Sequence, residues 1–296
     1  MPSQEMQRVI AAFAGQPNTL GTTSIAEQRA GMEAQLGNQA LPDGVTVEEI
    51  RFGALSADWV TLPTSAHGRV VLYLHGGGYV MGSRRTHREL ASRIARDASA
   101  RVLVLEYRLA PEHPFPAAVD DATEAYRWLR KQGIAASSIA IAGDSAGGGL
   151  TLATLLKLRD AGDALPACAV LLSPWTDLDG TGASAQPGGA DDPMIPLAAL
   201  RDMGKIYAQQ STNNALASPL HANFKGLPPL LIQVGTRELL LDDSTRVADK
   251  ARAAGVPVRL EIEDGAFHVW QAMPGLPEAA EAVKRIGAFV RERIPA

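Results

Sequence analysis

The pattern of apolar and polar positions along the chain changes near residue 69. Beyond this point, short and almost continuously apolar runs alternate with longer stretches in which apolar residues recur at helical spacing. The apolar runs predict strands over 69–75, 101–107, 138–144, 167–173, 229–235 and 257–263. The longer stretches predict helices near 86–98, 117–132, 146–161, 243–254 and 278–293. Apolar strands separated by amphipathic helices are typical of a parallel sheet covered on both faces.

Before residue 69 the pattern predicts two further strands and a helical segment. Residues 45–52 and 57–62 alternate apolar and polar side chains, which indicates an antiparallel start to the sheet with one solvated face. Together with the later strands they make an eight-stranded, mostly parallel sheet, so the fold class is α/β. Residues 1–40 read as helical, with apolar faces such as the one formed by Met6, Ile10 and Phe13.

The stretch 174–228 does not fit the alternation of strands and helices. It is too long for an ordinary connection between a strand and the next element, and it contains a predicted helix near 197–209. We interpret it as an insertion that lies over one end of the sheet. Together with residues 1–40 it would form a cap.

Composition and charge exclude several function classes. The chain has 296 residues, 46% of them apolar and 20% charged, and a formal net charge of −4. No basic stripe indicates a nucleic-acid partner, and no apolar run is long enough to span a membrane. The N-terminal residues lack the pattern of a signal peptide, so we expect a cytoplasmic protein. The single cysteine, Cys168, lies in an apolar run and is expected to be a buried hydrophobe.

The run Gly143-Asp144-Ser145-Ala146-Gly147 stands between a predicted strand and a predicted helix. A serine on such a tight turn is pushed out of the sheet, and its neighbours must be small to avoid a clash. This G-x-S-x-G turn predicts that Ser145 is a nucleophile. The N–H group of Ala146, directly after it, is expected to help bind a developing oxyanion.

A second glycine-rich turn, His75-Gly76-Gly77-Gly78, also follows a predicted strand. Without side chains, its glycines allow backbone N–H groups to approach an oxyanion closely. We expect His75 to organise this loop rather than to act as a base.

Ser145 needs a base, because an unaided hydroxyl is a poor nucleophile. Of the six histidines, only His268 lies in a loop directly after the last predicted strand. It is therefore the predicted base. The histidines are scattered without the spacing of metal ligands, so no metal is expected.

The base needs a carboxylate that orients it, and three acids follow the seventh predicted strand. Glu238 comes first and is favoured. Asp242 and Asp243 read as the start of a helix, where acids interact well with free N–H groups, but Asp242 remains the alternative. The order serine, acid, histidine is the one expected for α/β-hydrolases.

With these motifs, the chain resembles the bacterial hormone-sensitive-lipase-like esterases (family IV carboxylesterases) of the α/β-hydrolase fold. The resemblance covers residues 69–270 and rests on His75 to Tyr79, Tyr107 to Ala118, Gly143 to Gly148, Ser173-Pro174-Trp175 and Gly265 to His268. It implies that Gly77, Gly78 and Ala146 supply the oxyanion N–H groups. The family usually has an aspartate followed by Pro-Leu as its acid, where this chain has Glu238-Leu239-Leu240.

The resemblance also implies a function. It predicts hydrolysis of short- to medium-chain carboxylic esters through an acyl-enzyme, without a cofactor. It divides the chain into an N-terminal cap segment, 1–40, and a catalytic domain, 41–296, with a cap insertion at about 175–225. Tyr79 stands where the family often has phenylalanine, at the pocket wall. The candidate substrate contacts are His75, Gly76, Tyr79, Asp144 and Trp175.

Two questions stay open at this level. An amidase or deacetylase could use the same residues, and a non-catalytic small-molecule receptor could keep the same scaffold. The family implies a homodimer through the eighth strand, Pro257–Glu263, whereas a solvated edge strand is the alternative.

Overall fold

The computed structural model describes residues 1–15 and 20–295 and contains one eight-stranded sheet. Its strand order is β1-β2-β4-β3-β5-β6-β7-β8. The strands are β1 Thr46–Phe52, β2 Leu55–Thr61, β3 Ala66–Leu74, β4 Ala100–Glu106, β5 Ile139–Asp144, β6 Cys168–Leu172, β7 Leu230–Gly235 and β8 Val258–Glu263. β1 and β2 are antiparallel to their neighbours, and all the other pairs are parallel. The predicted α/β class with an antiparallel start is thus confirmed.

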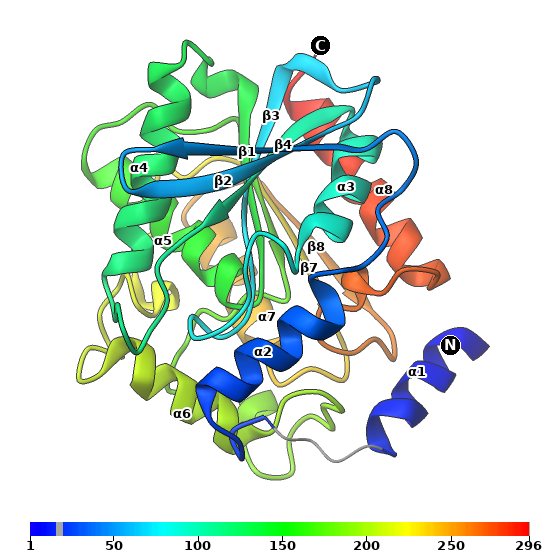
Figure 1. Cartoon of the computed structure of the whole chain (residues 1–296). Coiled ribbons are helices and arrows are strands. Elements are labelled where there is room, and N and C mark those ends of the chain that lie inside the picture. The colour runs from blue at the N-terminus through cyan, green and yellow to red at the C-terminus, as the bar shows by residue number, and fades with distance from the viewer. Residues whose placement is uncertain (16–19, 296) are drawn as a thin grey trace.

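Helices cover both faces of the sheet, as the apolar strands require (Figure 1). They are α3 Arg88–Ala98, α4 Ala117–Lys131, α5 Ala146–Asp160, α7 Leu241–Ala253 and α8 Pro277–Arg293. One apolar core joins α4, α5 and α7 to the sheet, and a second joins α3 and α8 to the opposite face. Each of these helices lies within a few residues of its predicted position.

The register of the parallel strands brings their carboxyl ends to one edge of the sheet. Leu74 pairs with Gly143, Asp144 pairs with Leu172, and Gly235 pairs with Glu263. The loops that follow β3, β5, β6, β7 and β8 therefore meet at this edge. These loops, with the strand ends and first helical turns beside them, carry the residues that the sequence singled out for chemistry.

Two further helices, α2 Ile25–Leu36 and α6 Leu197–Ala208, lie beside this edge at the lower end of the view in Figure 1. The start of α2 is fixed by a capping box, in which Ser24 and Glu27 exchange hydrogen bonds. Arg29 of α2 donates to the carbonyl oxygens of Val80 and Ala110 and pairs with Glu112. These bonds attach α2 to the loops that follow β3 and β4.

The first helix, α1 Gln4–Ala14, packs elsewhere. Its buried Met6 joins a small apolar cluster around the loop that follows β8. Phe13 packs edge-on against Phe267, at 5.3 Å between ring centres. Within the segment 1–40, α1 therefore packs against the loop that carries His268. Residues 16–19 of that segment lie outside the described part of the chain.

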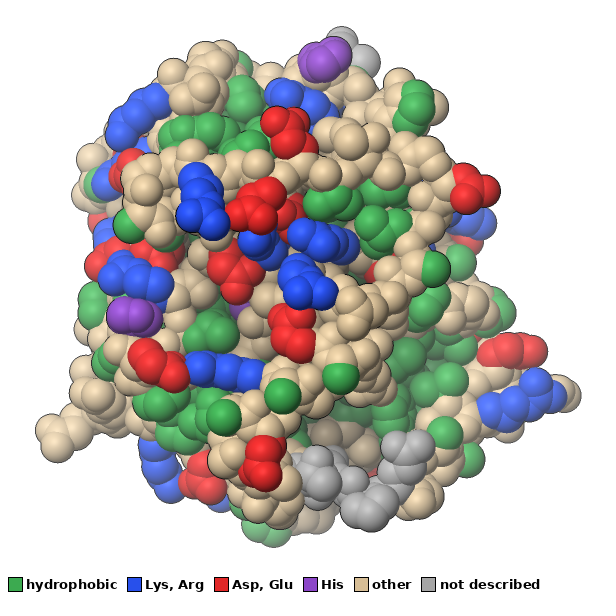
Figure 2. All heavy atoms as spheres, viewed as in Figure 1, with side chains coloured by type: hydrophobic (Ala, Val, Ile, Leu, Met, Phe, Trp, Pro, Cys, Tyr) green, Lys and Arg blue, Asp and Glu red, His purple; other side chains and the backbone are tan. Residues whose placement is uncertain are grey.

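Basic and acidic side chains are interleaved on the face that carries β1 and β2 (Figure 2). Arg84 and Arg88 both pair with the buried Asp58, and Arg84 also pairs with Glu49. In the part of the chain that the structure describes, no helix is long and apolar enough to cross a membrane.

Candidate active site

Ser145 lies on a strained turn between β5 and α5. Its backbone angles are φ 54° and ψ −120°, a region that a residue with a side chain rarely adopts and that costs about 1–3 kcal/mol. Gly147 must lack a side chain here, because a Cβ atom would collide with the carbonyl oxygen of Leu74. The hydroxyl is thereby presented beyond the end of the sheet, as the G-x-S-x-G motif predicts.

The loop after β3 lies beside this turn. Gly77 and Gly78 have positive φ angles of 114° and 63°, and both line the same cavity as Ser145. Ala146 is the first residue of α5, so its N–H group has no acceptor within the helix. The three residues expected to bind an oxyanion are thus grouped around Ser145.

The structure brings Glu238, and not Asp242, to His268. Nδ1 of His268 lies 2.9 Å from Oε2 of Glu238, and both side chains are buried. Asp242 lies in the first turn of α7, where its Oδ2 accepts a hydrogen bond of 3.0 Å from the backbone of Ser184. Its role there is to attach the insertion to α7.

Ser173, directly after β6, supports both members of this pair. Its hydroxyl donates to Oε1 of Glu238 at 2.8 Å and accepts from the N–H group of Val269 at 3.2 Å. The N–H group of Gly235 also donates to Oε1 of Glu238, at 2.6 Å. These donors favour the carboxylate form of Glu238 and fix its orientation.

The charge of Glu238 acts on His268. Burial by itself would lower the pKa of His268, but the hydrogen bond and the charge of Glu238 outweigh burial and raise the pKa above its ordinary value. A carboxylate at Nδ1 also keeps the proton on that nitrogen. Nε2 is then free to accept a proton, which is what an arrangement of serine, histidine and acid needs for nucleophilic attack.

A cavity of about 230 Å³ joins these groups. Ser145, His268, Gly77 and Gly78 lie in its wall, together with the predicted contacts Asp144 and Trp175. Most of the remaining wall is apolar. Part of it comes from α2 and from the insertion, which contains α6: Met32, Leu36, Met194, Ile195, Leu200 and Met203. Such a lining suits a substrate with an apolar chain.

Three predicted substrate contacts lie behind this wall and not in it. His75 and Tyr79 are buried, and neither they nor Gly76 line the cavity. The ring of Tyr79 stacks on that of Tyr207 at 3.7 Å, and the ring of His75 stacks on that of Tyr107 at 4.1 Å. The structure therefore places these three expected contacts in supporting positions, because both rings are buried in stacks with tyrosine rings and none of the three residues lines the cavity.

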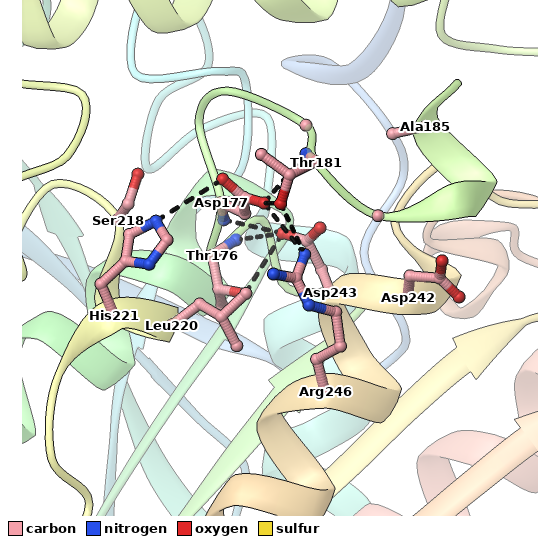
Figure 3. Close-up of polar contacts among 12 residues, drawn as sticks. Thr176, Asp177, Thr181, Ala185, Ser218, Leu220, His221, Asp242, Asp243 and Arg246 are labelled. Atoms are coloured by element: carbon pink, nitrogen blue, oxygen red, sulfur yellow. Dashed lines mark hydrogen bonds and ion pairs between the residues drawn. The ribbon is translucent and has the colours of Figure 1, made fainter. Parts of the chain in front are cut away.

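Thr176 and Asp177, which follow Trp175 in the chain, belong to a polar cluster at the start of the insertion (Figure 3). Asp243 of α7 accepts hydrogen bonds from the backbone N–H groups of Thr176 and Asp177, at 2.6 and 2.8 Å. Asp177 in turn pairs with Arg246 at 3.0 Å. Burial raises the pKa of Asp243 to about 7, although its hydrogen bonds oppose this shift. The cluster thus anchors the start of the insertion to α7.

The sequence did not single out Ser173 or His87 for a role at this site. Ser173 stands in a motif that carried the family resemblance, and His87 follows the glycine-rich loop by a few residues, but their partners come from distant strands. Among the described residues, no group of three or more His, Cys, Asp or Glu could hold a metal ion.

Comparison with known proteins gives the same fold and related activities. The protein-family model described as the alpha/beta hydrolase fold matches residues 71–272. A curated relative, "Acetyl-hydrolase" from Streptomyces hygroscopicus, is 46% identical over 269 residues, which cover 90% of this chain and 88% of the relative.

Two solved structures match almost the whole chain. The crystal structure of an esterase from the bacterial hormone-sensitive lipase (HSL) family has a TM-score of 0.94 at 44% identity, and covers 99% of each chain. The structure of EstE5 soaked with p-nitrophenyl butyrate has a TM-score of 0.95 at 44% identity, and covers 99% of this chain and 100% of the other.

Proposed function

Because the chain belongs to the bacterial hormone-sensitive-lipase family of α/β-hydrolases and is a carboxylesterase, we propose that it hydrolyses short- to medium-chain acyl esters with Ser145 as nucleophile. One observation carries the proposal. Ser145 on its strained turn and His268, hydrogen-bonded to Glu238, line one cavity together with Gly77 and Gly78.

The proposed reaction has two halves. Nε2 of His268 takes the proton of Ser145 while Oγ attacks the ester carbonyl, and the N–H groups of Gly77, Gly78 and Ala146 bind the oxyanion. When the intermediate collapses, His268 gives the proton to the leaving alcohol. A water molecule then attacks the acyl-enzyme, again with His268 as base, and the carboxylic acid is released.

The size of the cavity supports a short acyl chain. Its volume of about 230 Å³ lies below the range of about 300–1,000 Å³ that is usual for drug-sized ligands. The relative named acetyl-hydrolase and the neighbour soaked with p-nitrophenyl butyrate agree with this size.

Hydrolysis of a series of p-nitrophenyl esters from acetate to laurate tests the function. We expect kcat/KM to be highest for acyl chains of about four carbons or fewer, and to fall about 10-fold or more for the longest ones, which exceed the cavity. Ser145→Ala protein supplies the background rate. A preference for laurate, or wild-type turnover no faster than this background, would contradict the proposal.

The pH dependence of kcat/KM should report the ionisation of His268. Only the neutral imidazole accepts the serine proton, and Glu238 raises the pKa of His268. The rate should therefore rise with pH through a midpoint above about 6.5, the ordinary histidine value. Titration in a pH-stat measures it, and Glu238→Gln should move the midpoint of the residual activity down. Full activity at pH 4 would exclude histidine as the base.

We propose α2, α6 and the insertion as the cap of the active site. Their apolar side chains form one part of the cavity wall, and Arg29 attaches α2 to the catalytic part of the chain. On this proposal, the chain divides into a cap segment, 1–40, and a catalytic domain, 41–296. Within the cap segment, α1 packs against the loop that carries His268.

We propose a homodimer through β8. This strand is last in the sheet order, so among the described residues no strand pairs with its outer edge. It also carries Ile262, whose side chain is 48% exposed. Analytical ultracentrifugation of the wild-type protein should give a dimer, and Ile262→Lys should shift the equilibrium toward the monomer. A wild-type protein that stays monomeric at high concentration would exclude the interface.

The proposed cytoplasmic location rests on the sequence and is tested by cell fractionation.

A further inference from the structure

A second histidine–carboxylate pair lies beside the oxyanion loop. Nε2 of His87 is 3.4 Å from Oδ2 of Asp144, and both side chains are more than nine-tenths buried. His87 stands directly before α3, and Asp144 is the last residue of β5, next to Ser145. Both residues line the same cavity as Ser145, so this pair belongs to the surroundings of the reacting groups.

The contacts of His87 place a proton on Nδ1. Oγ of Thr86 accepts from the N–H group of Ser83 and donates its one proton to the Ser83 carbonyl oxygen, at 2.9 Å. Nδ1 of His87, 2.8 Å from that Oγ and 3.2 Å from that carbonyl, must therefore donate. Nε2 lies 3.4 Å from Oδ2 of Asp144 and 3.3 Å from the backbone nitrogen of Gly76. The carboxylate favours a second proton on Nε2, which would make His87 an imidazolium paired with Asp144.

The surrounding charges agree with this assignment. Burial would lower the pKa of His87, but the charge of Asp144 raises it above its ordinary value, with a smaller contribution from Glu106. The neighbouring His75, 5.3 Å away between ring centres, has its pKa lowered to about 3 by burial and by His87. Tyr73, also nearby, donates to Asp144. The pKa values of these two adjacent histidines are therefore shifted in opposite directions.

Asp144 links the oxyanion loop to the nucleophile turn. Its Oδ1 accepts from the N–H group of Gly76 at 3.1 Å and from the hydroxyl of Tyr73 at 2.7 Å. The contact is so close that a Cβ atom on Gly76 would collide with the carboxylate. A displacement of Asp144 would therefore move Gly76, and with it Gly77 and Gly78, relative to Ser145.

We propose that His87 is a positioning residue, whose ion pair with Asp144 holds the Gly76–Gly78 loop in the geometry that binds the oxyanion over Ser145. The inference rests on the proposed attack by Ser145. Nε2 of His87 contacts both Oδ2 of Asp144 and the backbone nitrogen of Gly76, so that His87 holds the carboxylate against the loop. The pair acts on the transition state, because oxyanion binding strengthens only when charge develops on the substrate oxygen.

Two substitutions separate the charge of His87 from its hydrogen bond. His87→Gln keeps a neutral hydrogen-bond donor toward Asp144, whereas His87→Leu removes both the charge and the donor. The matched control is His67→Gln, because His67 is exposed and lies near the start of β3, at the end of the strand away from the cavity. With p-nitrophenyl butyrate, we expect His87→Leu to lower kcat about 10- to 100-fold, somewhat less than the loss of an oxyanion donor itself. The kcat of His87→Gln should lie between those of His87→Leu and wild type. The KM of both variants should differ from the wild-type KM by less than about 2-fold.

An inhibitor pair distinguishes positioning from general damage. A trifluoromethyl ketone, which forms an oxyanion on Ser145, should bind about 10- to 100-fold more weakly to His87→Leu, whereas butyrate should bind equally well to both proteins. Equal weakening of both inhibitors, or an unchanged kcat, would overturn the inference. If wild type also fails to hydrolyse the ester, the proposed function has failed instead.

The charge state can be observed without the His87→Leu variant. In wild-type protein with ¹⁵N-labelled histidine, we expect one imidazolium signal to persist at pH 8 and to disappear in His87→Gln. A neutral His87 at that pH would overturn the ion pair. This measurement keeps the inference testable even where His87→Leu does not fold.

Discussion

Replacing Ser145 with alanine is expected to lower kcat for p-nitrophenyl butyrate about 10⁴-fold or more, the loss typical of a missing nucleophile. The hydroxyl stands on a strained turn in the wall of the cavity, and it is the group that would form the acyl-enzyme. The fold should survive, because alanine fits wherever serine does. Stopped-flow assays and thermal unfolding of both proteins measure the two effects.

Ser137→Ala is a suitable control for this variant. Ser137 is exposed and lies just before β5, at the end of the strand opposite to Ser145. Its replacement should leave kcat unchanged. Near-normal turnover by the Ser145 variant in a preparation free of other esterases would refute the proposed mechanism.

Glu238→Gln should lower kcat about 10³- to 10⁴-fold, and Asp242→Asn less than about 3-fold. A carboxylate only accepts, so Glu238 fixes the proton on Nδ1 of His268; a glutamine amide can present a donor there and favour the wrong tautomer. Asp242 instead accepts a hydrogen bond from the backbone of Ser184, in the insertion. Steady-state kinetics of both variants at pH 8 compare them directly.

Glu238→Asp adds a test of geometry. It keeps the charge but withdraws the carboxylate by one methylene, so its kcat should lie between those of wild type and Glu238→Gln. Greater damage from Asp242→Asn than from Glu238→Gln would mean that the acid has been assigned to the wrong residue. The fold would be unaffected by that result.

Most of the candidate site could be predicted because its residues stand on turns that follow strands. Ser145, His268 and the pair Gly77 and Gly78 each come directly after a predicted strand or close behind one. In a parallel sheet such positions meet at one edge, whatever the order of the strands. The choice of Glu238 over Asp242 followed the same rule, and the structure brings Glu238 to His268.

The supporting residues could not be predicted in this way. Ser173 and Glu238 are 65 positions apart, and His87 and Asp144 belong to different turns. Nothing local in the sequence marks these pairs, since a serine or histidine in a loop has many structural roles. Likewise, the stacking of Tyr79 on Tyr207 turned a predicted substrate contact into a buried support.

The sequence by itself determined the elements, their parallel arrangement and the turns that carry Ser145, Gly77, Gly78 and His268, because apolar periodicity and tight turns are local properties of a chain. Only the tertiary structure decided which side chains meet. It placed α1 behind the histidine loop and α2 over the cavity, and it paired His87 with Asp144. Those outcomes depend on packing between segments distant in sequence, where the partner of a buried polar group is set by the fold as a whole.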